Sequence, residues 1–109
     1  MKEFVDSFNE VAKECHQNSV NHGFWEGEQN SGEKIALMHS ELSEALEAIR
    51  EGNPSDKKLP EFTGVETELA DAIIRIMDFS VRNNFRVAEA LIAKHNYNLS
   101  RPYKHGKSF

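Results

Sequence analysis

The chain has 109 residues, of which 39% are hydrophobic and 28% charged, a composition typical of one globular domain covering residues 1–109. The net charge of −5 disfavours nucleic acid as the main partner, and no apolar run approaches the roughly 20 residues that a membrane span needs. A single cysteine, Cys15, excludes an internal disulfide and indicates a cytoplasmic protein, and the acidic N-terminus does not resemble a signal peptide.

Glycine, proline and asparagine divide the chain into four predicted helices and no strand. The first helix is expected over about residues 2–22 and the second over about 31–51, where Gly52 and Pro54 follow. Thr63 and Glu66 fit a capping box that begins the third helix, which is expected to end near Arg82. The fourth helix is expected over about 85–99, and Pro102 prevents its extension.

These elements predict an all-α fold, a compact arrangement of four helices resembling a bundle. The apolar residues of the third helix cover more than half of its circumference; they are Leu69, Ala70, Ala72, Ile73, Ile74, Ile76, Met77, Phe79 and Val81. A peripheral helix of a small monomer needs a narrower apolar stripe. The chain is therefore expected to form a homo-oligomer, either a homodimer or a homotetramer.

Two pairs of acids stand at the margins of these apolar stripes. Glu41 and Glu44 in the second helix, and Glu68 and Asp71 in the third, are each three residues apart, which brings their carboxylates onto neighbouring turns. If the pairs face each other, they form a set of hard oxygen ligands of the kind that Mg²⁺ prefers, with Mn²⁺ as a possible substitute. An alternative is that the acids are solvated and that Arg75 and Arg82 form ion pairs with the second pair along its own helix.

The two carboxylate pairs and the surrounding segments resemble the MazG-like, all-α nucleoside triphosphate pyrophosphohydrolases. The resemblance is carried by "GEKIALMHSELSEALEAIREG", "ELADAIIRIMDF" and "KHNYNLSRPYKHGK" and extends from about Phe24 to Lys107. It implies a Mg²⁺-dependent, oligomeric enzyme that cleaves a nucleoside triphosphate, a ribonucleotide or a deoxyribonucleotide, to the monophosphate and pyrophosphate. A role in removing unwanted nucleotides from the cellular pool is the expectation that follows.

The resemblance also implies roles for individual residues. Glu41, Glu44, Glu68 and Asp71 would bind the metal. Many relatives carry an additional acid directly before the first of these glutamates, where this chain has Ser40, so the catalytic base is left open between Glu41 and Glu44. The triphosphate would be held by basic and amide side chains near the C-terminus, namely Lys94, Asn98 and Arg101, with Lys104 and Lys107 as weaker candidates.

Trp25 is the only tryptophan and lies in the glycine-containing connector 23–32. It is a candidate for stacking on a nucleobase, with packing against the end of the helices as the alternative. An alternative function for the chain is that of a non-catalytic helical module for oligomerisation or interaction. In that case the acidic residues would only form the solvent-exposed faces of the helices. A di-iron carboxylate centre is disfavoured because no histidine follows a glutamate by three residues.

Overall fold

The structure is a computed structural model that describes residues 1–109, and it confirms an all-α fold with four main helices. They are α1 (Lys2–Asn21), α2 (Ser31–Arg50), α3 (Gly64–Asn83) and α4 (Val87–Leu99), followed by the short 3₁₀ helix η1 (Tyr103–Gly106). The helices begin and end within about two residues of the predicted positions. None of the helices combines the length and apolar character needed to cross a membrane.

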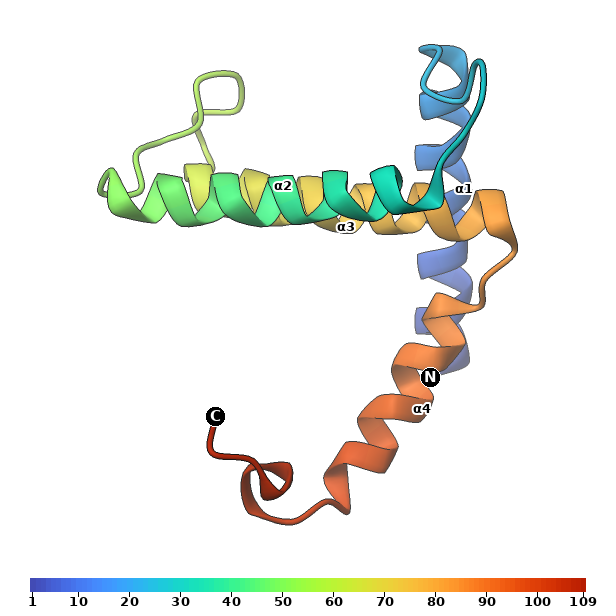
Figure 1. Cartoon of the computed structure of the whole chain (residues 1–109), viewed down its shortest axis with the longest axis vertical. Helices are drawn as coiled ribbons and strands as arrows, with labels where there is room; N and C mark the ends of the chain where they lie inside the picture. Colours follow the sequence, from blue (N-terminus) through green and yellow to red (C-terminus); the bar gives the residue numbers. More distant parts are fainter.

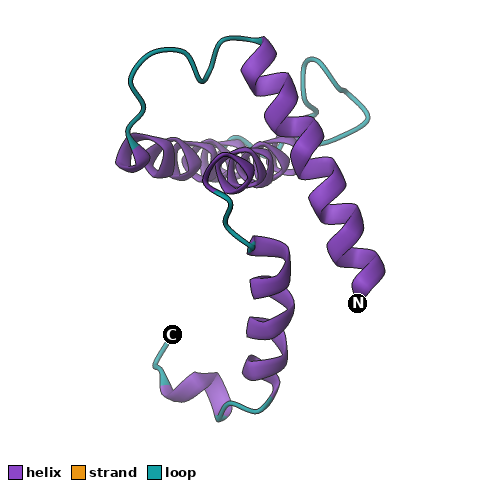
Figure 2. Cartoon of the chain, turned by 90° about the vertical axis from the view of Figure 1, so that its right-hand side faces the viewer, coloured by secondary structure: helices purple, strands orange, loops and turns teal.

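The side-by-side pair α2 and α3 is the centre of the structure. The two helices run antiparallel, joined by the loop 51–63, and α1 crosses α3 near its C-terminal end (Figure 1). The loop is held by Asp56, whose carboxylate accepts the backbone N–H groups of Lys58 and Leu59 and the hydroxyl of Thr67. The connector between α1 and α2 passes over the same end of the pair (Figure 2).

Local interactions explain where α2 and α3 begin and end. The Asn30 side chain accepts the backbone N–H of Glu33 at 3.0 Å and caps the first turn of α2. The predicted capping box is present in α3, where Thr63 and Glu66 each satisfy the backbone N–H of the other. Asn84 ends α3 in the left-handed conformation, with φ of 58°, which asparagine tolerates better than most residues.

Replacing Thr63 by alanine is expected to lower the free energy of unfolding by about 1 kcal/mol, because the amide that the hydroxyl satisfies at the start of α3 loses its partner. Denaturant unfolding followed by circular dichroism measures the change. Ser43→Ala is the matched control, since Ser43 is an exposed residue within α2 with no side-chain hydrogen bond. Equal stability of the two variants would contradict a stabilising role for the box.

The single chain is more open than the compact arrangement expected from the sequence. The Cα radius of gyration is 16.2 Å, compared with about 13 Å for a compact domain of this length. The fourth helix accounts for this difference. It packs chiefly on α1 and extends away from the α2–α3 pair, so it does not complete a bundle with them (Figures 1 and 2). Residues 87–109 are referred to below as the C-terminal arm.

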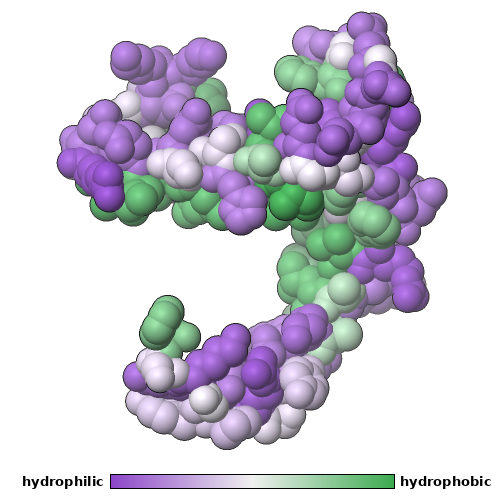
Figure 3. Space-filling model, in the orientation of Figure 1, coloured by the Kyte–Doolittle hydropathy of each residue, from purple (hydrophilic) through white to green (hydrophobic).

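An apolar surface on the α2–α3 pair is left uncovered. Its principal residues are Leu42 and Leu46 of α2 and Leu69 and Ile73 of α3, whose exposed fractions lie between 46% and 51%. The hydrophobic residues follow the edge of the α2–α3 pair that faces the gap above the C-terminal arm (Figure 3). This surface is referred to below as the apolar underside. A large apolar patch exposed on a single chain is typical of an interaction surface.

Candidate metal centre

Three of the four predicted metal ligands lie together. Glu41 and Glu44 of α2 and Glu68 of α3 each offer a carboxylate oxygen, and these oxygens lie within 4.8 Å of one another. The spacing of three residues places the first two on one side of α2, and the antiparallel packing of α3 brings the third beside them. The predicted convergence of acids from both helices is therefore present for these three residues.

The surroundings of these carboxylates leave oxygen atoms without a partner. Glu41 is only 8% exposed, and its Oε1 accepts a hydrogen bond from Arg75 Nε at 3.3 Å. The second oxygen of Glu41, Oε2, and the Oε2 of Glu68 are both buried and have no hydrogen-bond partner. Burying an unpaired carboxylate oxygen is costly, and a divalent cation is a partner that would remove this cost. All three side chains are hard oxygen donors, so the site fits Mg²⁺ or Mn²⁺.

The proximity of the acids changes the proton affinity of Glu68. Its pKa is raised to about 7, first because a protonated Glu68 carboxyl can donate a hydrogen bond to the Glu44 carboxylate, then because of burial and the negative charges of Glu44 and Glu41. Asp71 also has a raised pKa, chiefly through burial and secondly through the charge of Glu41, while Arg75 acts in the opposite direction. Without a cation, the carboxylates thus repel one another.

The stability of the metal-free protein is expected to rise as the pH falls from about 8 to 5. The pKa of the Glu68 carboxyl is about 7 in the folded state and about 4.3 in the unfolded state, so the folded protein binds this proton more tightly. The free energy of unfolding therefore falls as the pH rises through 7 and Glu68 loses its proton. Thermal unfolding in the presence of a chelator measures this. Glu68→Gln should flatten that part of the profile, and an identical profile for both proteins would contradict the raised pKa.

The fourth predicted ligand, Asp71, lies outside the group of three but shares a pocket with Glu41. The pocket has a volume of about 420 Å³ and is bounded by α1, the connector, α2 and α3. Its lining residues are Cys15, Asn18, Ser19, Phe24, Lys34, Leu37, Glu41, Asp71, Ile74, Arg75 and Asp78. It combines an apolar part with two cations and three carboxylates, a combination suited to a small organic anion bound through a metal.

Arg75 and Lys34 are pocket residues that the sequence reasoning did not assign to the site. Arg75 lies four residues after Asp71 and seven after Glu68, so helical spacing places all three on one face of α3. This spacing can be read from the sequence and indicates that Arg75 lies beside the acids. The ion pair of Arg75 is with Glu41 of the neighbouring helix, not with the acids of its own helix. The alternative in which ion pairs along α3 account for Glu68 and Asp71 is therefore not what the structure shows.

Trp25, the candidate for base stacking, is held by several side chains. Its indole Nε1 donates to Asp78 Oδ1 at 2.8 Å, and His16 Nδ1 lies 2.7 Å from the same oxygen. The charged ends of Lys34 and Arg82 lie 4.2 and 5.0 Å from the centre of the indole ring. The neighbouring Phe24 is 62% exposed and lines the pocket beside the carboxylates.

The predicted phosphate-binding residues lie on the C-terminal arm. Lys94 is exposed, and its ammonium lies 5.3 Å from the ring centre of Tyr97, with the Arg101 guanidinium 5.6 Å from the same centre. The Oδ1 of Asn98 is buried without a hydrogen-bond partner. None of these residues lines the pocket that contains Glu41 and Asp71, so within one chain the structure does not bring them to the carboxylates.

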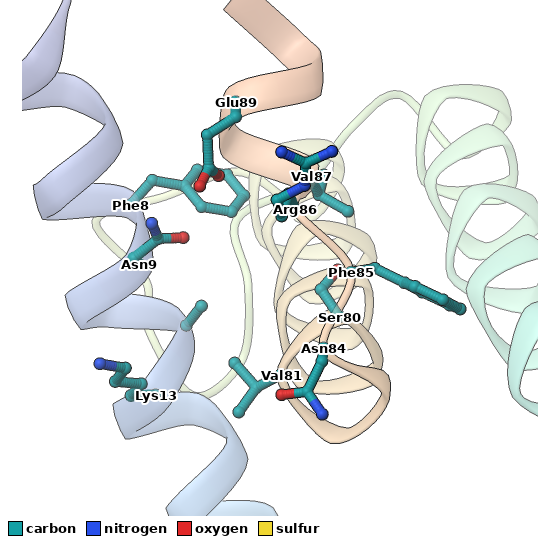
Figure 4. Close-up of a pocket in the computed structure, with 11 residues that line it drawn as sticks. Phe8, Asn9, Lys13, Ser80, Val81, Asn84, Phe85, Arg86, Val87 and Glu89 are labelled. Atoms are coloured by element: carbon teal, nitrogen blue, oxygen red, sulfur yellow. The ribbon is translucent and has the colours of Figure 1, made fainter.

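A second hollow, of about 270 Å³, lies where α4 leaves α3 and contains none of the predicted site residues. Phe8 of α1 projects toward the first turn of α4, and Val81, Asn84 and Phe85 border the opening (Figure 4). Nearby, Ala88 is completely buried. The hollow therefore marks the base of the C-terminal arm, where packing against α1 sets the direction of the arm.

Comparison with known proteins finds no family model that matches the chain and no detectable similarity to a curated protein or to a solved structure.

Proposed function

We propose that the protein is a Mg²⁺-dependent nucleoside triphosphate pyrophosphohydrolase, which cleaves a nucleoside triphosphate to the monophosphate and pyrophosphate. The observation that carries the proposal is the group of Glu41, Glu44 and Glu68, with two buried oxygens that lack partners, beside a pocket of about 420 Å³. The resemblance to MazG-like enzymes rests on the same acids and is consistent with this reading.

The residues of the site can be given separate roles in this reaction. A divalent cation bound there would neutralise charge on the phosphoryl oxygens and lower the pKa of a coordinated water. Glu41, Glu44, Glu68 and Asp71 would hold that cation. Either Glu41 or Glu44 would accept the proton of the attacking water, and Arg75, through its contact with Glu41, would keep that carboxylate in position.

The remaining substrate contacts follow from the pocket and from the resemblance. Lys34 and Arg75 line the pocket and can neutralise phosphate charge. Phe24 offers an exposed ring for contact with the nucleoside, close to the predicted stacking residue Trp25. Lys94, Asn98 and Arg101 would bind the triphosphate. A cytoplasmic homo-oligomer with a role in the nucleotide pool completes the proposal.

Incubation with each common ribonucleoside and deoxyribonucleoside triphosphate, and with several modified ones, tests the proposed reaction. In the presence of Mg²⁺ we expect equal amounts of nucleoside monophosphate and pyrophosphate, and no product with a chelator. Chromatography of the nucleotides and an enzymatic assay for pyrophosphate measure both products. Release of orthophosphate and a nucleoside diphosphate would identify a different cleavage position and contradict the proposal.

A second candidate function is a helical interaction module without catalysis, favoured by the uncovered apolar underside. It requires no metal at the carboxylates. It predicts that no triphosphate is hydrolysed and that Mg²⁺ with a nucleotide does not alter thermal stability, so the same preparation distinguishes the two functions.

A further inference from the structure

We infer that Asp78 of α3 is a positioning residue for the nucleoside part of the substrate. It fixes residues 22–30, the connector between α1 and α2, and thereby holds the wall of the pocket that Phe24 forms. The inference rests on the proposed function for the identity of the ligand, while the fixing of the connector can be tested without it. Three features carry it: the hydrogen bonds of Asp78, the packing around Trp25, and the place of Phe24.

One carboxylate oxygen of Asp78 joins three elements of the fold. Asp78 Oδ1 accepts the indole N–H of Trp25 at 2.8 Å and lies 2.7 Å from Nδ1 of His16. Trp25 belongs to the connector and His16 to α1, which crosses α3 near this end (Figure 1). The side chains of Asp78 and His16 are only 17% and 19% exposed, and hydrogen bonds to a carboxylate shielded from water are stronger than those between neutral groups. The contact therefore ties the connector and α1 firmly to α3.

The packing around Trp25 engages its whole side chain within the protein. The charged ends of Lys34 and Arg82 lie 4.2 and 5.0 Å from the centre of the indole ring, and the His16 ring meets it edge-on with centroids 5.8 Å apart. Trp25 is half-buried and is not among the residues that line the pocket of about 420 Å³. Both its N–H group and its ring are thus occupied, which is the arrangement expected of an anchor for the connector.

The residue that this anchor presents to the pocket is Phe24. Its side chain is exposed and lines the pocket, whereas its backbone is held on both sides. The N–H of Phe24 donates to the carbonyl oxygen of Ser19 at 3.1 Å, and its own carbonyl accepts a hydrogen bond from Lys34 Nζ at 3.0 Å. A free side chain on a fixed backbone is the arrangement expected of a residue that contacts a ligand.

The two ends of the pocket differ in chemistry. Glu41 and Asp71 line the end beside the carboxylate group, whereas Phe24 and Asp78 line the end formed by α1 and the connector. Asp78 follows Asp71 by seven residues, so it lies two turns further on the same face of α3, about 10 Å along the helix axis. A nucleotide whose phosphates reach the carboxylates through a cation can extend its sugar and base over this distance. The end that Asp78 holds is therefore the nucleoside end.

A positioning role and a general stabilising role of Asp78 lead to different results. If Asp78 only stabilises the fold, its removal weakens the binding of every ligand to a similar extent. If it positions the nucleoside end of the pocket, its removal weakens the binding of nucleotides and leaves the binding of phosphate groups at the carboxylates unchanged. In kinetic terms, the second case raises KM and has little effect on kcat, because an interaction made equally in the ground state and the transition state is lost.

Fluorescence of Trp25 tests the fixing of the connector without any ligand, because Trp25 is the only tryptophan of the chain. Asp78→Ala removes both hydrogen bonds, and we expect the quenching constant for acrylamide to rise by about twofold or more as the indole becomes accessible. Asp78→Asn should restore most of the protection, since its amide oxygen can still accept from the indole. Asp6→Ala is the matched control, because it removes an exposed ion pair within α1 and should leave quenching unchanged. Equal quenching of Asp78→Ala and the wild-type protein would overturn the inference.

Calorimetric titration with two ligands tests the link to the nucleoside. In the presence of Mg²⁺, Asp78→Ala should bind a nonhydrolysable deoxynucleoside triphosphate about 10-fold more weakly than the wild-type protein, and should bind pyrophosphate, which has no nucleoside, equally well. Trp25→Phe keeps an aromatic ring but lacks the indole N–H, so it should show the same selective loss.

The outcomes separate the inference from the proposed function. An equal loss of affinity for both ligands, or normal nucleotide affinity in Trp25→Phe, would overturn the positioning role while the proposed function stands. A wild-type protein that releases no pyrophosphate from any nucleoside triphosphate refutes the proposed function. The quenching of Trp25 in Asp78→Ala then decides by itself whether Asp78 fixes the connector.

Discussion

Replacing Glu41 by glutamine or Asp71 by asparagine is expected to abolish pyrophosphate release, with a loss of at least about 100-fold in kcat/KM. Each change keeps the size of the side chain but removes the negative charge that a divalent cation requires. The effect is expected to be largest at Glu41, which is buried and has an oxygen without a partner. Initial rates at saturating Mg²⁺ measure the loss.

The same variants should remain folded. The amide oxygen of glutamine can still accept from Arg75, and removal of one negative charge reduces repulsion among the acids of the metal-free site. Thermal unfolding should therefore show little loss of stability. Glu33→Gln is the matched control, because Glu33 is an exposed glutamate in the first turn of α2 that lines neither the pocket nor the carboxylate group. Full activity of Glu41→Gln would refute the metal assignment.

Mg²⁺ together with a nonhydrolysable deoxynucleoside triphosphate is expected to stabilise the protein. At a ligand concentration of 100 times Kd, binding to the folded state alone adds about 2.7 kcal/mol to the free energy of unfolding. For a chain of this length, that corresponds to a rise in Tm on the order of 10 °C. Differential scanning fluorimetry with metal alone, nucleotide alone and both together separates the contributions.

A comparison of variants assigns this stabilisation to the carboxylates. Glu68→Gln should lose most of the shift that requires Mg²⁺, whereas Glu33→Gln should retain it. If no nucleotide changes the Tm of the wild-type protein with Mg²⁺ present, the helical interaction module becomes the better description, and the uncovered apolar underside would then be its binding surface.

The helices were predictable because their signals are local. Asn30, Thr63 and Asn84 act on backbone groups within a few residues, so the caps and ends of α2 and α3 follow from neighbouring sequence. The approach of Glu41, Glu44 and Glu68 was predictable for a related reason. Spacing of three residues places acids on one side of a helix, and an apolar stripe beside them indicates which side meets another helix.

Contacts between distant segments could not be predicted in the same way. The sequence left Trp25 as a candidate either for stacking on a base or for packing at the end of the helices, and it gave no sign that the indole donates to Asp78, 53 residues further on, or that two cations lie near its ring. The spacing of Arg75 indicated its face of α3, but not that its partner is Glu41 of α2. Pairings between elements depend on how helices are rotated and placed, which no periodicity within one helix specifies.

The sequence by itself therefore determined four helices, their boundaries and the side of α2 and α3 on which the acids stand, since each depends on periodicity and capping over a few turns. Only the tertiary structure decided that Asp71 lies outside the group formed by the other three carboxylates while sharing a pocket with Glu41, and that the arm with Lys94 and Arg101 extends away from the pocket of its own chain. The physical reason is that the direction of α4 depends on contacts between separate elements at its base, where Ala88 is buried and the rings of Phe79 and Phe85 pack, and no periodicity within one helix specifies such contacts.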